Sequence, residues 1–260
     1  MGVVNVTPDS FSDGGRFLDP AAAVAQARRL LAEGADALDI GGESTRPGAA
    51  PVSEAEEAAR ILPVIAAIRA ESDVPISVDT IKPAVARQAV AAGATIWNDI
   101  TALDAPESLA TAADLGCRVV LMHMQGTPRT MQVQPRYEDV VGEVEAFLAA
   151  RAEAAIGAGV RPGAIWLDPG IGFGKTLAHN LALLANLDRL ARLGFPILLG
   201  VSRKSFIKAI DPSATEASDR LGGSLAAGLW GVRAGVAAVR VHEVRETVQA
   251  LKMWSAIQQA

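Results

Sequence analysis

The stretch AIWLDPGIGFGKT, residues 164–176, shows the unit from which the chain is built. It begins with a short apolar run, ends that run on the acidic residue Asp168, and continues into a glycine-rich turn. Continuous rather than alternating hydrophobicity indicates a strand that is covered on both faces, as in a parallel sheet. Similar runs recur along the whole chain. Besides 164–168, they span residues 2–6, 35–40, 75–80, 94–99, 118–123, 195–202 and 236–242.

The segments between these runs have the composition and the period of amphipathic helices. They span residues 20–33, 53–71, 83–92, 105–115, 138–158, 178–193, 217–234 and 243–258. Eight strands that alternate with eight helices over roughly 250 residues are typical of a (β/α)8 TIM barrel. We therefore predict an α/β fold with a single barrel domain over residues 1–260. A doubly wound open sheet is the alternative, although that fold usually has fewer strands at this length.

The glycine-rich turn is similar to a phosphate-binding loop but fails the spacing of both common motifs. A P-loop that ends in Gly174-Lys175 requires a glycine at position 169, which is proline here. A dinucleotide-binding loop requires a glycine three residues after Gly172, and that position is Lys175. The turn therefore has another explanation than nucleotide binding.

The overall composition excludes several classes of protein. A net charge of -5 and a pI of about 5.3 provide no basic field to attract nucleic acid. The single cysteine, Cys117, excludes an internal disulfide and fits a reducing compartment. No apolar run reaches the roughly 18 residues of a membrane span. We expect a cytoplasmic protein that binds neither nucleic acid nor membranes.

Polar residues occur at or near the end of each predicted strand. A barrel gathers these ends at one mouth, where barrel enzymes have their active sites. Asp79, Asn98 and Asp168 are mainly hydrogen-bond acceptors and suit a planar heterocycle with adjacent N–H donors. Lys204 and Arg240 are cations and suit an anion such as a diphosphate. The full set is Asn5, Asp39, Asp79, Asn98, His123, Asp168, Ser202, Arg203, Lys204, Arg240 and His242.

Two loops, residues 7–17 and 41–51, are longer than a barrel connection requires. Both are rich in glycine, proline and serine, which favour turns and mobility. They contain Phe11, Arg46 and Pro47, whose side chains are suited to contact with a ligand. We therefore predict that the two loops form a lid over the bound ligand.

Taken together, eight motifs resemble those of the dihydropteroate synthase family. They are MGVVNVTPDSFSDGG, DIGGESTRPGA, ISVDT, WNDI, LMHMQGTPRTMQ, LDPGIGFGKT, SRKSF and RVHEV, in family order along nearly the whole chain. The resemblance implies a (β/α)8 barrel and a transferase of folate biosynthesis. This enzyme joins 6-hydroxymethyl-7,8-dihydropterin diphosphate to 4-aminobenzoate, which gives 7,8-dihydropteroate and diphosphate. It also implies assistance by Mg²⁺ and inhibition by sulfonamides.

The resemblance assigns roles to individual residues. Asn5 matches the magnesium ligand, and Arg240 with His242 matches the diphosphate anchor. The residues that match the pterin site are Thr45, Asp79, Asn98, Asp168 and Lys204. Among them, the expected catalytic residues are Asp79, Asp168 and Lys204. Those that match the surroundings of the aminobenzoate are Phe11, Pro47, Phe173 and Ser205. Asp13 and Arg46 match polar residues of the two loops, and Arg46 is expected to bind substrate.

Two alternatives share part of this pattern. A pterin-binding methyltransferase on a similar barrel has the pterin acceptors but no need for the stretches NVTPDSFSDGG and SRKS. A non-catalytic pterin-binding homologue has the pocket without turnover. Asn5, Arg240 and His242, all present here, favour the synthase over both.

The stretch LGGSLAAGLWGVRAG, residues 221–235, is small and apolar on nearly every face. A helix on the outside of a barrel has such a surface only when something covers it. We therefore expect the protein to form a homodimer.

Overall fold

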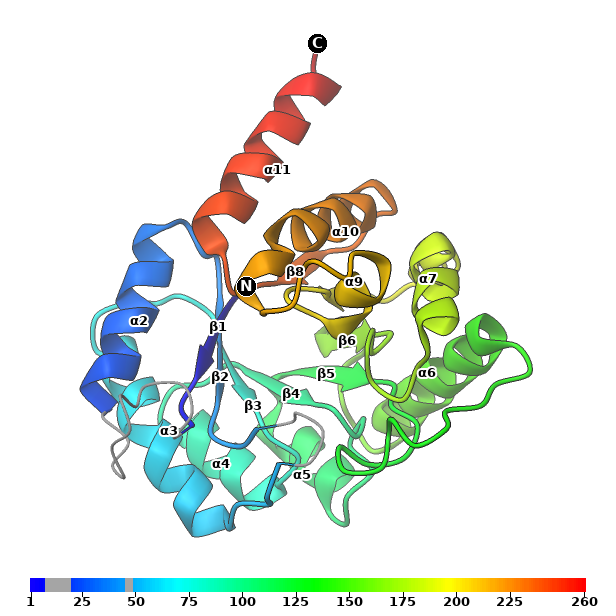
Figure 1. Cartoon of the computed structure of the whole chain (residues 1–260). Helices are drawn as coiled ribbons and strands as arrows, with labels where there is room; N and C mark the ends of the chain where they lie inside the picture. The colour runs from blue at the N-terminus through cyan, green and yellow to red at the C-terminus, as the bar shows by residue number, and fades with distance from the viewer. Residues whose placement is uncertain (8–19, 45–48) are drawn as a thin grey trace.

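The strands of the computed structural model form a parallel barrel, shown in Figure 1. The structure describes residues 1–7, 20–44 and 49–260. β1 to β6 pair in chain order, β7 pairs with β8, and isolated bridges join Gly2 to Val241 and Leu167 to Ile197. These bridges close the ring and confirm the predicted barrel. The strands are β1 (Gly2–Asn5), β2 (Leu38–Gly41), β3 (Ile76–Asp79), β4 (Ile96–Asp99), β5 (Arg118–Met122), β6 (Ile165–Asp168), β7 (Leu198–Gly200) and β8 (Ala238–Arg240).

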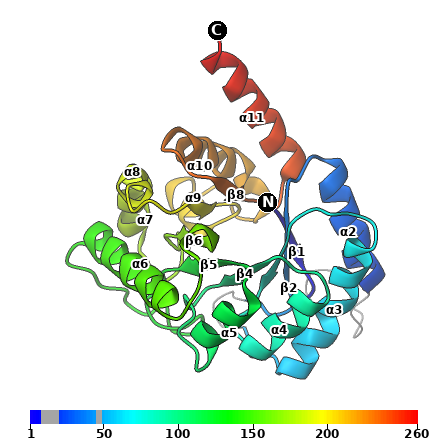
Figure 2. The same ribbon diagram turned by 180° about the vertical axis from the view of Figure 1, so that it is seen from behind.

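Helices lie on the outside of the strands, and Figure 2 shows the same arrangement from behind. None of the described helices is long and apolar enough to cross a membrane. The helices are α2 (Pro20–Ala32), α3 (Glu54–Arg69), α4 (Pro83–Ala91), α5 (Ser108–Leu115), α6 (Val140–Gly157), α7 (Leu177–Ala185), α8 (Leu187–Ala191), α9 (Ser205–Ile210), α10 (Leu221–Arg233) and α11 (Val244–Gln258).

The strands are buried on both faces, as their continuous hydrophobicity predicts. β2 and β4 are buried at every position. The core extends outward into the helices through Leu30, Ile65 and Leu148, which are completely unexposed. Because the space around the strands is filled by apolar side chains, the room for polar chemistry lies beyond the carboxyl ends of the strands.

The helical segments differ from the predicted ones in two places, and the last helix differs in how little of it is buried. The segment 178–193 is divided into α7 and α8 at Asn186, which has non-helical φ and ψ and donates from Nδ2 to the carbonyl of Ala182 at 2.9 Å. The short helix α9 follows β7 and lies outside the eight predicted helical segments. In α11 only Val244 is buried, and the helix projects away from the barrel in both views (Figures 1 and 2).

Candidate functional site

A cavity opens at the carboxyl ends of the strands. β3, β5, β6, β7 and β8 each contribute their last residue to its wall. The lining residues are Asp79, Asn98, Ile100, Met122, Asp168, Gly170, Ile171, Phe173, Gly200, Lys204 and Arg240. The structure therefore brings six of the predicted substrate-binding residues around one space, namely Asp79, Asn98, Asp168, Phe173, Lys204 and Arg240.

Arg240 lies between two carboxylates at this mouth. Its Nε donates to Asp39 Oδ2 at 2.5 Å, and its Nη2 donates to Asp79 Oδ2 at 2.9 Å. Burial disfavours the cation, but the carboxylates of Asp39 and Asp79 outweigh this effect and raise the pKa of Arg240. Burial and the neighbouring Asp39 raise the pKa of Asp79 to about 7, against the attraction of Arg240. Arg240 therefore stays cationic, whereas Asp79 is close to titration at neutral pH.

Asp168 and Lys204 face the cavity from β6 and from the loop after β7. Asp168 Oδ1 accepts a hydrogen bond from the backbone N–H of Gly170 at 2.7 Å. Burial raises the pKa of Asp168, while the Gly170 N–H, Lys204 and Arg240 limit the rise. Burial lowers the pKa of Lys204 to about 8, and its Nζ lies 4.0 Å from the centre of the Phe173 ring. The cavity thus combines a carboxylate, an ammonium group and an aromatic face.

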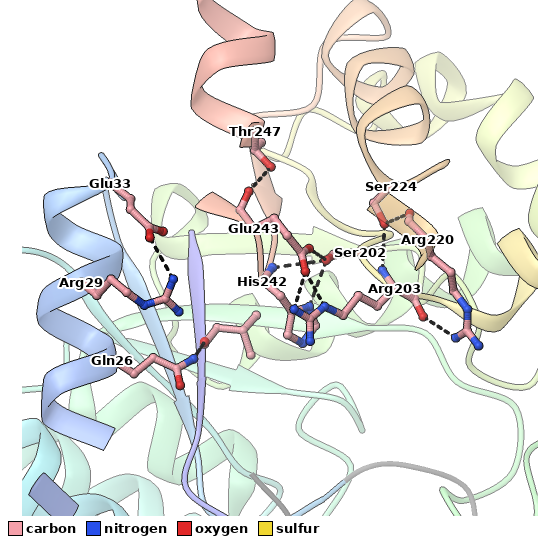
Figure 3. Close-up of polar contacts among 11 residues, drawn as sticks. Gln26, Arg29, Glu33, Ser202, Arg203, Arg220, Ser224, His242, Glu243 and Thr247 are labelled. Carbon is pink, nitrogen blue, oxygen red and sulfur yellow. Dashed lines mark hydrogen bonds and ion pairs between the residues drawn. The ribbon is translucent and has the colours of Figure 1, made fainter. Parts of the chain in front are cut away.

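A polar network joins the loops that follow β7 and β8 (Figure 3). Ser202 Oγ lies 2.9 Å from His242 Nδ1 and donates to Glu243 Oε2 at 3.2 Å. Glu243 Oε1 also accepts from Nε of Arg203 at 2.5 Å, and the backbone N–H of Arg203 donates to Ser224 Oγ at 2.9 Å. This network sets the orientation of the His242 imidazole, two residues beyond Arg240.

A second pocket adjoins the cavity and shares Asp79 and Ile100 with it. Its remaining wall comes from the loops after β2, β3 and β5 and from Glu57 on α3, and most of the accessible lining is apolar. Lys82 forms ion pairs with Glu43 and with the unexposed Glu57 at its border. Burial raises the pKa of Glu57, and its hydrogen bond with Lys82 opposes the rise. Asp79 therefore stands between two neighbouring pockets at the barrel mouth.

The other predicted site residues lie at the rim or outside the described part of the chain. Asn5 is the last residue of β1 and is half-buried. Ser205 is the first residue of α9 and is exposed. The predicted residues outside the described ranges are Phe11, Asp13, Thr45, Arg46 and Pro47. The lid that includes them stays a prediction.

Asp39 was predicted among the polar residues at the strand ends, but its pairing with Arg240 was not. The residue does not end its strand, because β2 continues to Gly41. It is completely buried and accepts from Arg240, while its Oδ1 has no hydrogen-bond partner among the described residues. The apolar wall residues Ile100 and Met122 were missed as well, since nothing in their chemistry distinguishes them from core residues. The only signal was their position next to a strand end.

Comparison with known proteins gives one family. A family model described as pterin binding enzyme matches residues 1–242. The dihydropteroate synthase of Neisseria meningitidis serogroup B is 52% identical over 265 residues, which is 99% of this chain and 92% of the relative.

Solved structures show the same similarity in three dimensions. The Xanthomonas albilineans dihydropteroate synthase with 4-aminobenzoic acid has a TM-score of 0.94 at 50% identity, over 100% of this chain and 92% of that one. The same enzyme in complex with 7,8-dihydropteroate has a TM-score of 0.91 at 47% identity, over 100% and 93%. The Yersinia pestis dihydropteroate synthase in a sulfonamide drug complex has a TM-score of 0.94 at 45% identity, over 100% and 94%.

Proposed function

The chain belongs to the family of pterin-binding enzymes, and from this membership we infer that its strand-end cavity carries out the reaction of a dihydropteroate synthase. The reaction joins 6-hydroxymethyl-7,8-dihydropterin diphosphate to 4-aminobenzoate and releases diphosphate, which makes the protein a transferase of folate biosynthesis. The observation that carries this inference is the meeting of acceptors and cations around one cavity.

The acceptors suit the pterin. Asp79, Asn98 and Asp168 line the cavity from three different strands, and their oxygens can accept from the N–H groups of an aminopyrimidinone. Asp168 keeps Oδ2 for such a contact, since Oδ1 accepts from Gly170. Buried carboxylates are unfavourable unless they are partnered, so a ligand with adjacent donors stabilises this arrangement.

The chemistry proceeds by dissociative substitution. As the diphosphate leaves, positive charge develops on a methylene group that is conjugated with the dihydropterin ring. The carboxylates of Asp79 and Asp168 stabilise this charge, while Lys204 and Arg240 attract the anionic leaving group. The aryl amine of 4-aminobenzoate is neutral near pH 7, so its attack needs no strong base. In agreement, burial and the cationic Lys175 lower the pKa of His123, which lies against the glycine turn, to about 3.

Magnesium is the proposed metal. The described residues contain no group of three or more His, Cys, Asp or Glu side chains that could form a protein-only metal site. Mg²⁺ prefers oxygen ligands and often binds through few protein atoms together with substrate phosphates and water. The amide oxygen of Asn5 at the end of β1 fits that donor set. When bound there, Mg²⁺ would neutralise part of the diphosphate charge.

A coupled assay for diphosphate release tests the proposed function. We expect release only when dihydropterin diphosphate and 4-aminobenzoate are both present, and a sulfonamide should inhibit it in competition with 4-aminobenzoate. Pterin binding without any release would indicate the non-catalytic homologue. Methyl transfer from a folate without diphosphate release would indicate the methyltransferase.

We also propose that the protein is a homodimer in the cytoplasm. The proposed interface includes α7 as well as α10. Gly231 of α10 is explained by the barrel itself, since a Cβ there would lie 2.3 Å from Leu199 Cδ2. Two of the exposed large apolar residues lie on this side of the barrel, namely Trp230 on α10, 45% exposed, and Leu181 on the adjacent α7, 42% exposed. An interface at this surface would cover both. The single-domain organisation over residues 1–260 likewise stays a prediction.

Sedimentation velocity tests the dimer. The wild-type protein at micromolar concentration is expected to sediment as a dimer, and Leu181→Glu is expected to shift it to the monomer because the substitution places a charge in an apolar contact. Met253→Glu, on the projecting part of α11, is the matched control and should leave the dimer intact. A wild-type protein that sediments only as a monomer contradicts the proposal.

A further inference from the structure

Lys175 is a buried lysine that the proposed reaction does not use. Its residue is 3% exposed, and it follows the glycine turn without lining the cavity. Its Nζ lies 2.9 Å from the carbonyl oxygen of Phe173, 3.0 Å from that of Gly170, and 2.9 Å from Nδ1 of His123. A buried cation is unfavourable unless it is well partnered, and here its partners are largely backbone carbonyls of the turn.

The turn has glycines at positions where a side chain would not fit. Gly170, Gly172 and Gly174 have φ values of +67°, +83° and +61°, which glycine adopts without strain. A Cβ at Gly170 would lie 1.9 Å from the carbonyl oxygen of His123. The turn therefore runs directly against the backbone that follows β5, and hydrogen bonds from neighbouring side chains help to hold it there.

Neutral donors hold the outer side of the turn, and Lys175 holds the buried side. Gln132 Nε2 donates to the carbonyl of Gly172 at 2.7 Å, and the hydroxyl of Tyr137 donates to the carbonyl of Gly174 at 2.7 Å. The carbonyls of Gly170 and Phe173 face inward to the ammonium group instead.

His123 completes the arrangement around Lys175. Because burial and the adjacent Lys175 keep the imidazole neutral, its Nδ1 can accept a hydrogen bond while Nε2 carries the proton. The ring also packs edge-on against Phe147, with centroids 4.9 Å apart. The ammonium group thus has its three shortest contacts with Gly170 O, Phe173 O and His123 Nδ1, and the carbonyl oxygen of His123 lies at 3.3 Å.

We propose that Lys175 is a positioning residue for 4-aminobenzoate, because its ammonium group holds the turn in the shape that presents Phe173 to the cavity. Phe173 lines the cavity, and its ring lies against Lys204. Lys175 reaches the ligand only through this backbone. The inference rests on the proposed function, since it takes Phe173 as a contact of the aminobenzoate.

The pH dependence of binding follows from the groups that face Lys175. They are His123 after β5, Asp168 at the end of β6 and Lys204 after β7. Burial lowers the pKa of Lys175 to about 7, with Asp168 opposing and Lys204 adding to the effect. The ammonium group is therefore present below about pH 7 and is lost as the pH rises through that value. A neutral amine has one N–H donor fewer, so the turn loses one of its anchors.

The test compares Lys175→Met with Lys208→Met, a matched change at an exposed lysine of α9. At saturating dihydropterin diphosphate and pH 6, Lys175→Met is expected to raise the KM for 4-aminobenzoate by about 10-fold, because buried carbonyls lose their donor. The kcat and the calorimetric Kd of the pterin should change by less than about threefold. In the wild type the KM should rise between pH 6 and 9, and in Lys175→Met the rise should be smaller, because only the titrations of Asp79 and Lys204 in the cavity persist.

Three outcomes overturn the proposal. They are an unchanged KM in Lys175→Met, an equal loss of pterin and aminobenzoate binding, and a wild-type pH profile in the variant. If Lys175→Met does not fold, Lys175→Gln, which keeps two N–H donors without charge, carries the same comparison and should show a smaller rise in KM. Failure of the proposed function is distinct, because the wild type and Lys208→Met would then release no diphosphate.

Discussion

Asp168→Asn is expected to lower kcat/KM by about 100-fold or more while the protein remains folded. The asparagine keeps an oxygen that can accept from the Gly170 N–H, so the local structure is preserved. It loses the negative charge that faces the cavity and that would stabilise the cation formed on the pterin methylene. Steady-state kinetics with both substrates measures the loss, and circular dichroism checks the fold.

Asp188→Asn is the matched control for this substitution. Asp188 lies on α8, pairs with Arg192 at the surface, and lines neither of the two pockets at the barrel mouth. An exposed pair of this kind contributes little, so activity should stay at the wild-type level. Near-normal turnover in Asp168→Asn would contradict the assignment of Asp168 to the pterin site.

Arg240→Met is expected to lower the free energy of unfolding by about 3 kcal/mol at pH 8. The substitution keeps most of the volume of the side chain but removes the cation that lies between Asp39 and Asp79. Asp39 is completely buried and already has one oxygen without a partner among the described residues, so water cannot easily replace the guanidinium. Urea denaturation of the variant and the wild type measures the difference.

The loss should depend on pH in a defined direction. Folding raises the pKa of Asp79 to about 7, from an ordinary value near 4, and removal of Arg240 raises it further. A carboxyl group with a raised folded pKa leaves stability intact below the unfolded pKa and reduces it as the pH rises through the folded pKa. The loss in Arg240→Met should therefore be smaller at pH 5 than at pH 8.

Arg245→Met provides the control, because Arg245 is exposed on α11. It should change the stability at neither pH. An equal loss for Arg240→Met at pH 5 and pH 8 would mean that Arg240 acts through packing rather than through charge.

The barrel was predictable because each strand is covered on both faces. That environment requires continuous apolar runs, such as VVLM at 119–122, and these are visible without a structure. The break between α7 and α8 was not predictable, since it depends on the local conformation of Asn186 within a segment of helical composition. The exposure of α11 was hidden for a similar reason, because an apolar helical pattern does not show what the helix packs against.

The site was predictable where the topology alone brings residues together. Asp79, Asp168 and Arg240 end their strands, so any parallel barrel places them at one mouth. The pairing of Arg240 with Asp39 depends on the closure of β8 against β1, which connects residues 201 positions apart. Lys175 was recognised in the sequence only as a lysine that misses a nucleotide motif. Its partners are backbone carbonyls, and the sequence carries no signal for their direction.

The two isolated bridges that close the ring divide the barrel into unequal arcs. One arc, β1 to β6, holds Asp79, Asn98 and Asp168, whereas the other, β7 and β8 with their loops, holds Lys204 and Arg240. Across the closure between β8 and β1, attraction between Arg240 and its two carboxylates supplements a single backbone bridge. When the smaller arc opens in a partial unfolding event, it takes the cations away from the acceptors. Hydrogen exchange at the two bridges and loss of ligand affinity would then report on the same opening.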